Sequence, residues 1–455
     1  MNYQKIIDEL DFKTYSCVFS DIRIETTTTS TVRLKDGDIV QANSNPTAGY
    51  FIRVYNKGQW FYQSSTDFTK IDQNIRRLIE LSQDYPEVKS NYSGPIFNGT
   101  HQLIKYENDR FDKITMDEKI SIVKKYELLK NKIANIAEYA IAYTDIYKQK
   151  YYKNSKGTAF AYDFNQAGLN FRVTLKNGEN LFEDGINNYA SNFGALLKLE
   201  DQILKHFEEA QKFLNAKTVE PGKYDLVLSP ELVGIFTHES FGHKSEADFM
   251  IGDPEAIKEW ELGKKVGSDI LSIIDSGLHE NTSGYCPIDD EGNLAKKNYL
   301  IKDGKLTGRL HSTETAHELN EEPTSNCRAM NFEWEPIVRM TSTYIEAGTD
   351  SFEQILKKAG DSALYLDGAN HGTGGSTFTI APKRAYRIKD GKLSEPLKVA
   401  LISGSVFETL NNITAVGSDF KLWSSAFGGC GKMSQMPLPV ADGGPTILVK
   451  GMTVS

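Results

Sequence analysis

The sequence is poor in cysteine and has no long apolar run, and both shortages narrow what it can encode. Only four of its 455 residues are cysteine, and no two of these form a C-x-x-C pair. A disulfide-stapled secreted scaffold is therefore disfavoured, and each cysteine is expected to be a small buried side chain or a metal ligand. No stretch of about 18 apolar residues occurs, so the sequence predicts no membrane-spanning helix.

Positive charge is scarce as well. The chain has 52 Lys and Arg against 61 Asp and Glu, for a net charge of −9, and its basic residues are dispersed. Because binding to nucleic-acid phosphates rests on clustered Lys and Arg, nucleic acid is not expected as the main partner. The first residues, MNYQKIIDELDF, contain acids and lack the apolar core of a secretory signal, so a cytoplasmic location is predicted.

The length of the chain and the change in its pattern of helix and strand signals predict two domains. Residues 1–220 mix helix and strand patterns, with an irregular connection over residues 85–112, strands over 158–164 and 169–175, and a long amphipathic helix over 194–214. Pro221-Gly222 marks the predicted boundary, which leaves residues 221–455 as the second domain.

The second domain is expected to be mostly antiparallel β. The hexamer Ile-Lys-Asp-Gly-Lys-Leu occurs at residues 301–306 and again at 388–393, each time between strand-like segments. Asp-Gly in a two-residue loop is a strong hairpin signal. The predicted fold class is therefore α+β, in which an N-terminal mixed α/β domain precedes a β-rich C-terminal domain that carries the helix described next.

The segment Thr-His-Glu-Ser-Phe-Gly-His over residues 237–243 is the most informative in the chain. It places Glu239 directly after His238, with His243 five residues beyond the first histidine. In the common zinc-peptidase signature, histidines at i and i+4 hold Zn²⁺ and the intervening Glu is the general base. An α-helix advances about 100° per residue, so residues at i and i+5 lie about 140° apart.

An undistorted helix therefore cannot aim both rings at one ion. Either His238 and His243 have unrelated roles, or the helix contains a π-type turn, a distortion often found at functional sites. Ser229 suits an N-cap, Pro230 suits the first helical position, and Gly242 tolerates such a turn. A catalytic zinc site also needs a third protein ligand, which this helix does not supply.

A glycine-rich segment over residues 371–377 superficially resembles a phosphate-binding loop. It lacks the lysine of a P-loop and precedes a strand pattern at residues 378–380 instead of a helix. A glycine-rich turn close to the active site is the favoured interpretation.

The C-terminal half resembles the TldD/PmbA family of metallopeptidases, specifically its TldD-like, metal-bearing branch. The matching blocks are residues 238–248 (HESFGHKSEAD, against HExxGHxxExD), 289–292 (DDEG), 339–344 (RMTSTY, against RMxNxY) and 428–435 (GGCGKMSQ, against GxCGKxxQ). Weaker blocks at 34–37 and 49–54 extend the resemblance into the first half. Ser434 stands where the family usually has Gly, and residues 341–343 lack its Asn, which affects details of the substrate loops.

The resemblance implies that His238, His243 and Cys430 hold one Zn²⁺ per chain and that Glu239 is the catalytic carboxylate. By this implication, Glu239 takes a proton from zinc-bound water as the water attacks a peptide carbonyl. The expected substrates are peptides or unfolded protein segments, held in a site enclosed by a homodimer or by a heterodimer with a related subunit.

Several roles stay open at the level of sequence. Glu246 and Asp248 either orient a ligand imidazole or are solvated acids at a helix end. His311 and His317 either assist substrate binding or belong to the core or surface. The chief alternative for the whole chain is a non-catalytic partner subunit of the same family, and retention of the metal block argues against it. A modulator of DNA topology is disfavoured by the acidic charge.

Overall fold

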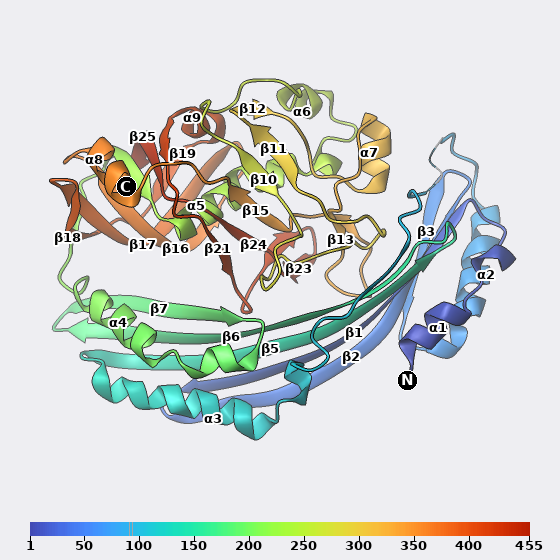
Figure 1. The fold of residues 1–455 in the computed structure, drawn as a ribbon, viewed down its shortest axis with the longest axis horizontal. Helices are drawn as coiled ribbons and strands as arrows, with labels where there is room; N and C mark the ends of the chain where they lie inside the picture. Colours follow the sequence, from blue (N-terminus) through green and yellow to red (C-terminus); the bar gives the residue numbers. More distant parts are fainter. Residues whose placement is uncertain (91, 93) are drawn as a thin grey trace.

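A long curved sheet forms the N-terminal half of the chain and faces a β-rich C-terminal half across its concave side (Figure 1). The computed structural model describes residues 1–90, 92 and 94–455. The sheet has the order β3-β2-β1-β5-β6-β4, with β7 also paired to β6, and β4 is its parallel member. Its strands are β1 (Phe19–Lys35), β2 (Asp38–Asn56), β3 (Gln59–Ser65), β4 (Thr100–Leu103), β5 (Ile136–Asn154), β6 (Ala159–Asn177) and β7 (Asn180–Ala190).

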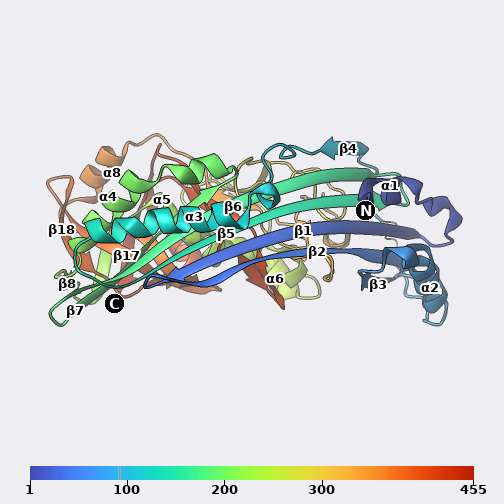
Figure 2. The same ribbon diagram turned by 90° about the horizontal axis from the view of Figure 1, so that it is seen from below.

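Helices cover the convex side of this sheet (Figure 2). They are α1 (Tyr3–Glu9), α2 (Ile71–Gln83), α3 (Met116–Glu127) and α4 (Glu200–Gln211). Apolar side chains of α3 and α4, such as Val123 and Phe207, pack with Leu169 and Phe171 of β6. The alternation of side chains along each strand sends the other set of residues to the concave side, toward the C-terminal half.

Two predictions about this half are wrong in detail. The strands predicted over 158–164 and 169–175 are one strand, β6. Gly168 lies in its middle, where a Cβ atom would come within 2.8 Å of the ring of Phe427, so the glycine marks a close approach instead of a turn.

The helix predicted over 194–214 is divided. A 3₁₀ turn (Phe193–Leu197) ends before α4 begins at Glu200. The hydroxyl of Tyr126 donates to the carbonyl of Leu196 (2.5 Å) and accepts from the N–H of Leu199 (3.1 Å), and so replaces helical hydrogen bonds at the break. The connection over 85–112 contains strand β4, and Asn91 and Ser93 within it lie outside the described residues.

The C-terminal half consists of two larger sheets and two small hairpin-like pairs. One sheet has the order β16-β9-β25-β19-β17-β18-β8, with β20 beside β25, and the other has the order β12-β11-β10-β15-β24-β21. Their strands are β8 (Lys217–Thr218), β9 (Gly222–Leu228), β10 (Ile273–Asp275), β11 (Asn298–Lys302), β12 (Lys305–Leu306), β15 (Ser342–Ile345), β16 (Leu364–Thr373), β17 (Thr377–Lys389), β18 (Lys392–Lys398), β19 (Ile402–Ser405), β20 (Ile413–Val416), β21 (Lys421–Ser424), β24 (Ala441–Gly444) and β25 (Ile447–Val454).

The remaining elements of this half are short. The two small pairs are β13 (Cys327–Arg328) with β14 (Ile337–Val338), and β22 (Cys430–Lys432) with β23 (Gln435–Leu438). The helices are α5 (Pro230–Phe236), α6 (Pro254–Glu259), α7 (Thr313–Leu319), α8 (Phe352–Ala359) and α9 (Val406–Asn411). No helix in the described part of the chain is long and apolar enough to cross a membrane.

The fold is α+β with a mostly antiparallel C-terminal half, as predicted. Both hexamers form hairpins, β11–β12 and β17–β18, in which Asp303 and Asp390 adopt left-handed φ angles of 49° and 53°. The division of the chain at residues 220/221 stays a prediction. Strand β8, at residues 217–218, pairs with β18 of the C-terminal sheet.

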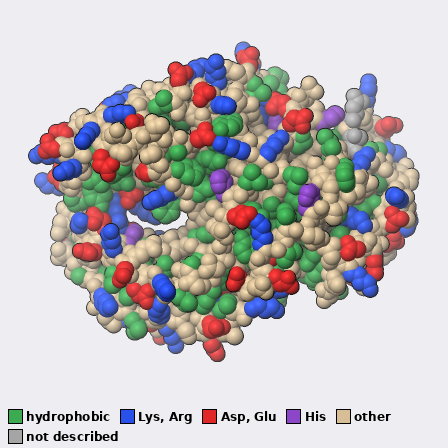
Figure 3. Space-filling model, viewed as in Figure 1, with side chains coloured by type: hydrophobic (Ala, Val, Ile, Leu, Met, Phe, Trp, Pro, Cys, Tyr) green, Lys and Arg blue, Asp and Glu red, His purple; other side chains and the backbone are tan. Residues whose placement is uncertain are grey.

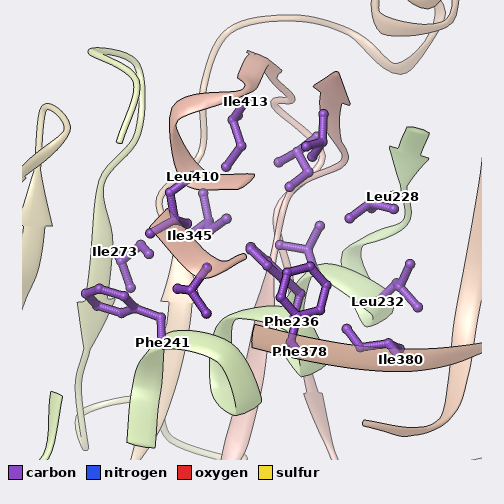
Figure 4. Close-up of a cluster of buried hydrophobic side chains, with 14 of the residues drawn as sticks. Leu228, Leu232, Phe236, Phe241, Ile273, Ile345, Phe378, Ile380, Leu410 and Ile413 are labelled. Atoms are coloured by element: carbon purple, nitrogen blue, oxygen red, sulfur yellow. The ribbon is translucent and has the colours of Figure 1, made fainter. Parts of the chain in front are cut away.

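Helix α5 lies between the two C-terminal sheets, at the centre of the largest apolar core (Figure 4). Phe236 at its end packs edge-on against Phe378 of β17, with ring centroids 5.0 Å apart. Leu232, Phe236 and Phe241 are all fully buried. Because close-packed apolar side chains surround α5, the end of this helix is held in place, and so is the beginning of the segment that follows it.

Candidate metal centre

The helix that carries the histidines begins as the sequence predicts. Ser229 is the N-cap of α5, its hydroxyl accepts the N–H of Leu232 (3.4 Å), and Pro230 occupies the first turn. Strand β9 precedes the cap directly, so the helix leaves the sheet with a defined direction.

The chain continues from α5 into a π-helical turn, Thr237–Gly242. The backbone N–H of His243 donates to the carbonyl oxygen of His238, which is the i to i+5 bond of a π-helix and joins the two histidines themselves. The rings meet edge to face, with centroids 5.1 Å apart. A Cβ atom at Gly242 would overlap Sδ of Met340, so a larger residue at this turn would require the buried Met340 side chain to move. The predicted distortion is confirmed.

Cys430 reaches the same place from strand β22. One donor atom each from His238, His243 and Cys430 lie within 4.8 Å of one another, and Sγ of Cys430 is 3.5 Å from Nε2 of His243. Tetrahedral zinc with S and N ligands at about 2.3 and 2.0 Å keeps such donors about 3.5 Å apart. A Cβ atom at Gly429 would overlap the carbonyl oxygen of Leu438, so the glycine allows the strand to pack this closely.

The donor set fits a zinc ion in a second respect. Nδ1 of His238 is buried and has no hydrogen-bond partner among the described residues. Nδ1 of His243 contacts Glu246 Oε2 (3.2 Å), which leaves its Nε2 toward Cys430. Buried polar atoms are rarely left without a partner, so an imidazole of this kind suits a ligand role.

The charges in the triad favour the protonation state that zinc requires of cysteine. Burial alone would raise the pKa of the Cys430 thiol, but the charges and hydrogen bonds of the two imidazoles lower that pKa to about 5. Burial lowers the pKa of His243, yet contacts with Cys430 and Glu246 outweigh burial and raise that pKa to about 10. The metal-free site therefore holds a thiolate beside an imidazolium.

A buried lysine, Lys432, contacts the two acidic residues that follow His243 in the sequence. Nζ of Lys432, on the same strand as Cys430, lies 3.2 Å from Glu246 and 2.6 Å from Asp248, and it donates to the carbonyl of Val338 (2.8 Å). Glu246 thus orients His243, as one of the two expectations held. Asp248 does not contact a ligand ring; it fixes the lysine that holds Glu246.

The triad opens into a cleft of about 810 Å³ between α4, strand β7 and the C-terminal sheets. Figure 3 shows an opening between the two halves of the molecule. Glu239 is half-buried and lines the cleft with the triad. Asp442 lines it too; burial raises the pKa of Asp442 to about 7, repulsion by Glu231 and Glu239 adds to this, and the attraction of His238 opposes it.

Two further histidines lie elsewhere. His311 is buried and contacts Thr315 (3.1 Å) and Glu321 (3.0 Å), and His317 is exposed against the ring of Tyr92. Neither is among the described residues that line the cleft, which favours the core alternative for His311 and the surface alternative for His317.

The glycine-rich segment does border the site. It forms the turn between β16 and β17, and a Cβ atom at Gly374 would overlap the carbonyl oxygen of Glu239. The turn therefore presses directly on the π-helical residue next to His238. Sequence reasoning missed Asp442, which stands alone in its segment, whereas Lys432 was visible as the Lys of the GxCGKxxQ block.

Two family models match the chain. The model described as PmbA/TldA metallopeptidase C-terminal domain matches residues 221–455, and the model described as PmbA/TldA metallopeptidase domain 1 matches residues 20–83. A protein of Methanocaldococcus jannaschii named a metalloprotease is 32% identical over 459 aligned residues, which cover 98% of each chain. The chain therefore belongs to the TldD/PmbA family of metallopeptidases.

Two other known proteins extend this result. A protein of Saccharolobus solfataricus named a zinc metalloprotease TldD homolog is 28% identical, and the match covers 96% of each chain. The crystal structure of TldE from Thermococcus kodakarensis has a TM-score of 0.78 with 16% identity, and the match covers 100% of this chain and 99% of that one. At this identity the structural match concerns the fold alone.

Proposed function

We propose that this chain is a zinc-dependent peptidase of the TldD-like branch, which hydrolyses peptides or unfolded protein segments. The observation that carries the proposal is the meeting of His238, His243 and Cys430 around one point beside Glu239. Two imidazoles and a thiolate are a donor set that zinc prefers, and three protein ligands leave a position open for chemistry.

Bound zinc would supply a Lewis acid for the peptide carbonyl and lower the pKa of water at the open position. Glu239 would accept the proton that this water loses and deliver it to the leaving amine. Glu246 would keep the His243 ring in place through its Nδ1, and Lys432 would keep Glu246 in place.

The cleft suits a polypeptide better than a folded protein. Its walls include residues 185–187 of β7 and residues 423–425 at the end of β21, which are edge strands of their sheets. Exposed strand edges can bind an extended chain through its backbone, without a defined sequence. We also propose a second copy or a related subunit as partner, since a solved TldE shares the fold. The cytoplasmic location stays a prediction.

The test compares two substitutions. Glu239→Gln should retain about one zinc per chain and lose cleavage of a peptide library by about 100-fold or more, because it removes the proton acceptor and no ligand. His243→Ala should lose the zinc as well. Metal analysis and mass spectrometry of the peptides give both quantities.

Glu208→Gln, on the exposed side of α4, is the matched control and should change neither quantity. Purified protein that binds no zinc, or a Glu239→Gln variant that cleaves as fast as the parent, would show the peptidase proposal to be wrong. A chain that binds zinc and cleaves nothing would instead favour the non-catalytic partner.

A further inference from the structure

A second cavity, of about 450 Å³, lies on the other side of the segment that precedes Cys430. Its floor is the concave face of the N-terminal sheet, and its roof is formed by residues 426–428 and 437–439. Gly428 lines both this cavity and the metal cleft, so the two spaces are neighbours separated by one short stretch of backbone. No part of the catalytic proposal uses this cavity.

Basic side chains dominate its charged lining. Lys148 and Lys150 of β5 both face Glu25 of β1, with Nζ to carboxylate distances of 3.0 and 3.7 Å. Lys150 also contacts Asp290 (2.7 Å), and Asp290 is shared with Arg23 (3.3 Å). Three cations, the buried Arg23 and Lys150 and the partly buried Lys148, thus share two carboxylates.

Arg328, at the roof of the cavity, adds a fourth cation. Its N–H groups donate to the carbonyls of Met340 (2.5 Å) and Pro439 (2.8 Å), and it pairs with no carboxylate within the described residues. Arg33, exposed at the rim, likewise forms no ion pair in the described part of the chain. Because buried charge is costly unless it is compensated, this surplus of positive charge favours an anion.

The rest of the lining can hold a peptide that carries such an anion. Thr27, Thr29 and Thr31 project from alternate positions of β1 into the cavity and offer hydroxyl groups along one line. Phe164 and Phe427 add apolar surface. A lining of hydroxyls, cations and aromatic rings suits a short polypeptide segment with a carboxylate better than a purely apolar ligand.

We propose that this cavity binds a carboxylate of the substrate polypeptide, held chiefly by Lys148 and Arg328, while a neighbouring peptide bond lies in the metal cleft beyond Gly428. The proposal rests on the proposed peptidase function and adds a preference for acidic substrates. Burial lowers the pKa of Lys148 and repulsion by Lys150 lowers it further against the attraction of Glu25, so a bound anion would stabilise the protonated amine.

The test uses peptides of one length that differ in charge. One carries Glu and its partner carries Gln at the same position, and each is made with a free or an amidated C-terminus, so that a side-chain carboxylate is distinguished from a terminal one. For the parent protein, kcat/KM should be about tenfold higher for the peptide whose carboxylate reaches the cavity than for its neutral counterpart, as expected for one charged hydrogen bond. The difference should come from a lower KM.

Lys148→Gln should lower the ratio of kcat/KM for the acidic peptide to kcat/KM for the neutral peptide to about two or less. Arg33→Gln, at the exposed rim, should narrow it in the same direction with little risk to folding. Lys124→Gln, on the convex side of the sheet, is the matched control and should leave the ratio unchanged.

Equal kcat/KM for acidic and neutral peptides in the parent would overturn the proposal, as would a Lys148→Gln variant that slows both equally. If the parent cleaves neither peptide, the peptidase function fails, and the cavity is judged by binding alone. In that case fluorescence anisotropy should give a lower Kd for the labelled acidic peptide with the parent and no preference with Lys148→Gln; equal Kd values with the parent would overturn the inference.

Discussion

The two halves of the molecule bury different kinds of side chain. The C-terminal half surrounds α5 with fully buried hydrocarbon, such as Leu232 and Phe236. Where the concave face of the N-terminal sheet meets the C-terminal half, charged side chains are buried instead: Lys150 of β5 pairs there with Asp290 of the C-terminal half. The comparison indicates two different roles: close-packed hydrocarbon positions the residues of the candidate metal site, and the charged concave face of the N-terminal sheet is suited to contact with a polar chain.

The charged side chains on the concave face of the N-terminal sheet also hold the two halves together. Arg53 of β2 pairs with Asp21 of β1 (2.5 Å) and with Glu291 of the C-terminal half (3.0 Å). The hydroxyl of Tyr152 lies within hydrogen-bonding distance of both Asp21 Oδ2 (3.2 Å) and the carbonyl oxygen of Glu291 (3.0 Å). If this network is structural, its loss should cost stability, whereas changes near the metal should cost zinc affinity.

The largest effect on stability is expected from Arg53→Met. The variant leaves Asp21 and Glu291 buried without their cation, so the free energy of unfolding should fall by about 3–5 kcal/mol. Urea denaturation followed by circular dichroism measures this change. Arg53→Lys, which keeps the charge, should lose clearly less. A decrease in the free energy of unfolding of less than about 1 kcal/mol for Arg53→Met would mean that these ion pairs do not hold the two halves together.

A smaller and more local effect is expected from Lys432→Met. Without the lysine, Glu246 loses the cation that holds it against His243, and zinc affinity should fall by about 10–100-fold. Competition with a chelator gives the zinc Kd, and the visible spectrum of the cobalt-substituted protein reports the ligand geometry. Lys432→Arg should restore part of the affinity. An unchanged Kd and an unchanged cobalt spectrum in Lys432→Met would limit the lysine to a packing role.

The smallest effect is a dependence of zinc binding on pH. In the metal-free site the pKa of Cys430 is about 5 and that of His243 about 10, so at pH 7 the proton that zinc displaces comes from the imidazolium. Affinity should therefore rise from pH 6 to pH 8, by about tenfold per unit for each displaced proton. Calorimetry in buffers of different ionisation enthalpy counts the protons, and an affinity independent of pH would contradict this assignment.

Much of the geometry of the candidate metal site could be predicted from the sequence because its signals are local. The spacing of His238 and His243 predicted the π-helical turn, and Ser229 with Pro230 predicted the helix start. Cys430 came from the family resemblance, since it lies 187 residues beyond His243. The two hairpins followed from Asp-Gly pairs, which are local signals as well.

The errors and omissions have a common physical cause. The break before α4 depends on the hydroxyl of Tyr126, and β6 continues through Gly168 because β5 and β7 pair with it on either side; both depend on contacts distant in sequence. The same is true of the charged cavity, whose lining joins β1, β5 and the C-terminal half. A single sequence contains no periodic or spacing signal for such encounters.

The π-helical turn also bears on how metal sites are recognised in other sequences. A zinc signature is usually written as a fixed number of residues between ligands, but an ion responds only to the direction and height of the donor atoms. Here one additional residue is absorbed within a single helical turn, and the two imidazoles still meet. A search that treats ligand positions as angles around a helix axis, with one inserted residue allowed, would find sites of this kind that a fixed pattern overlooks.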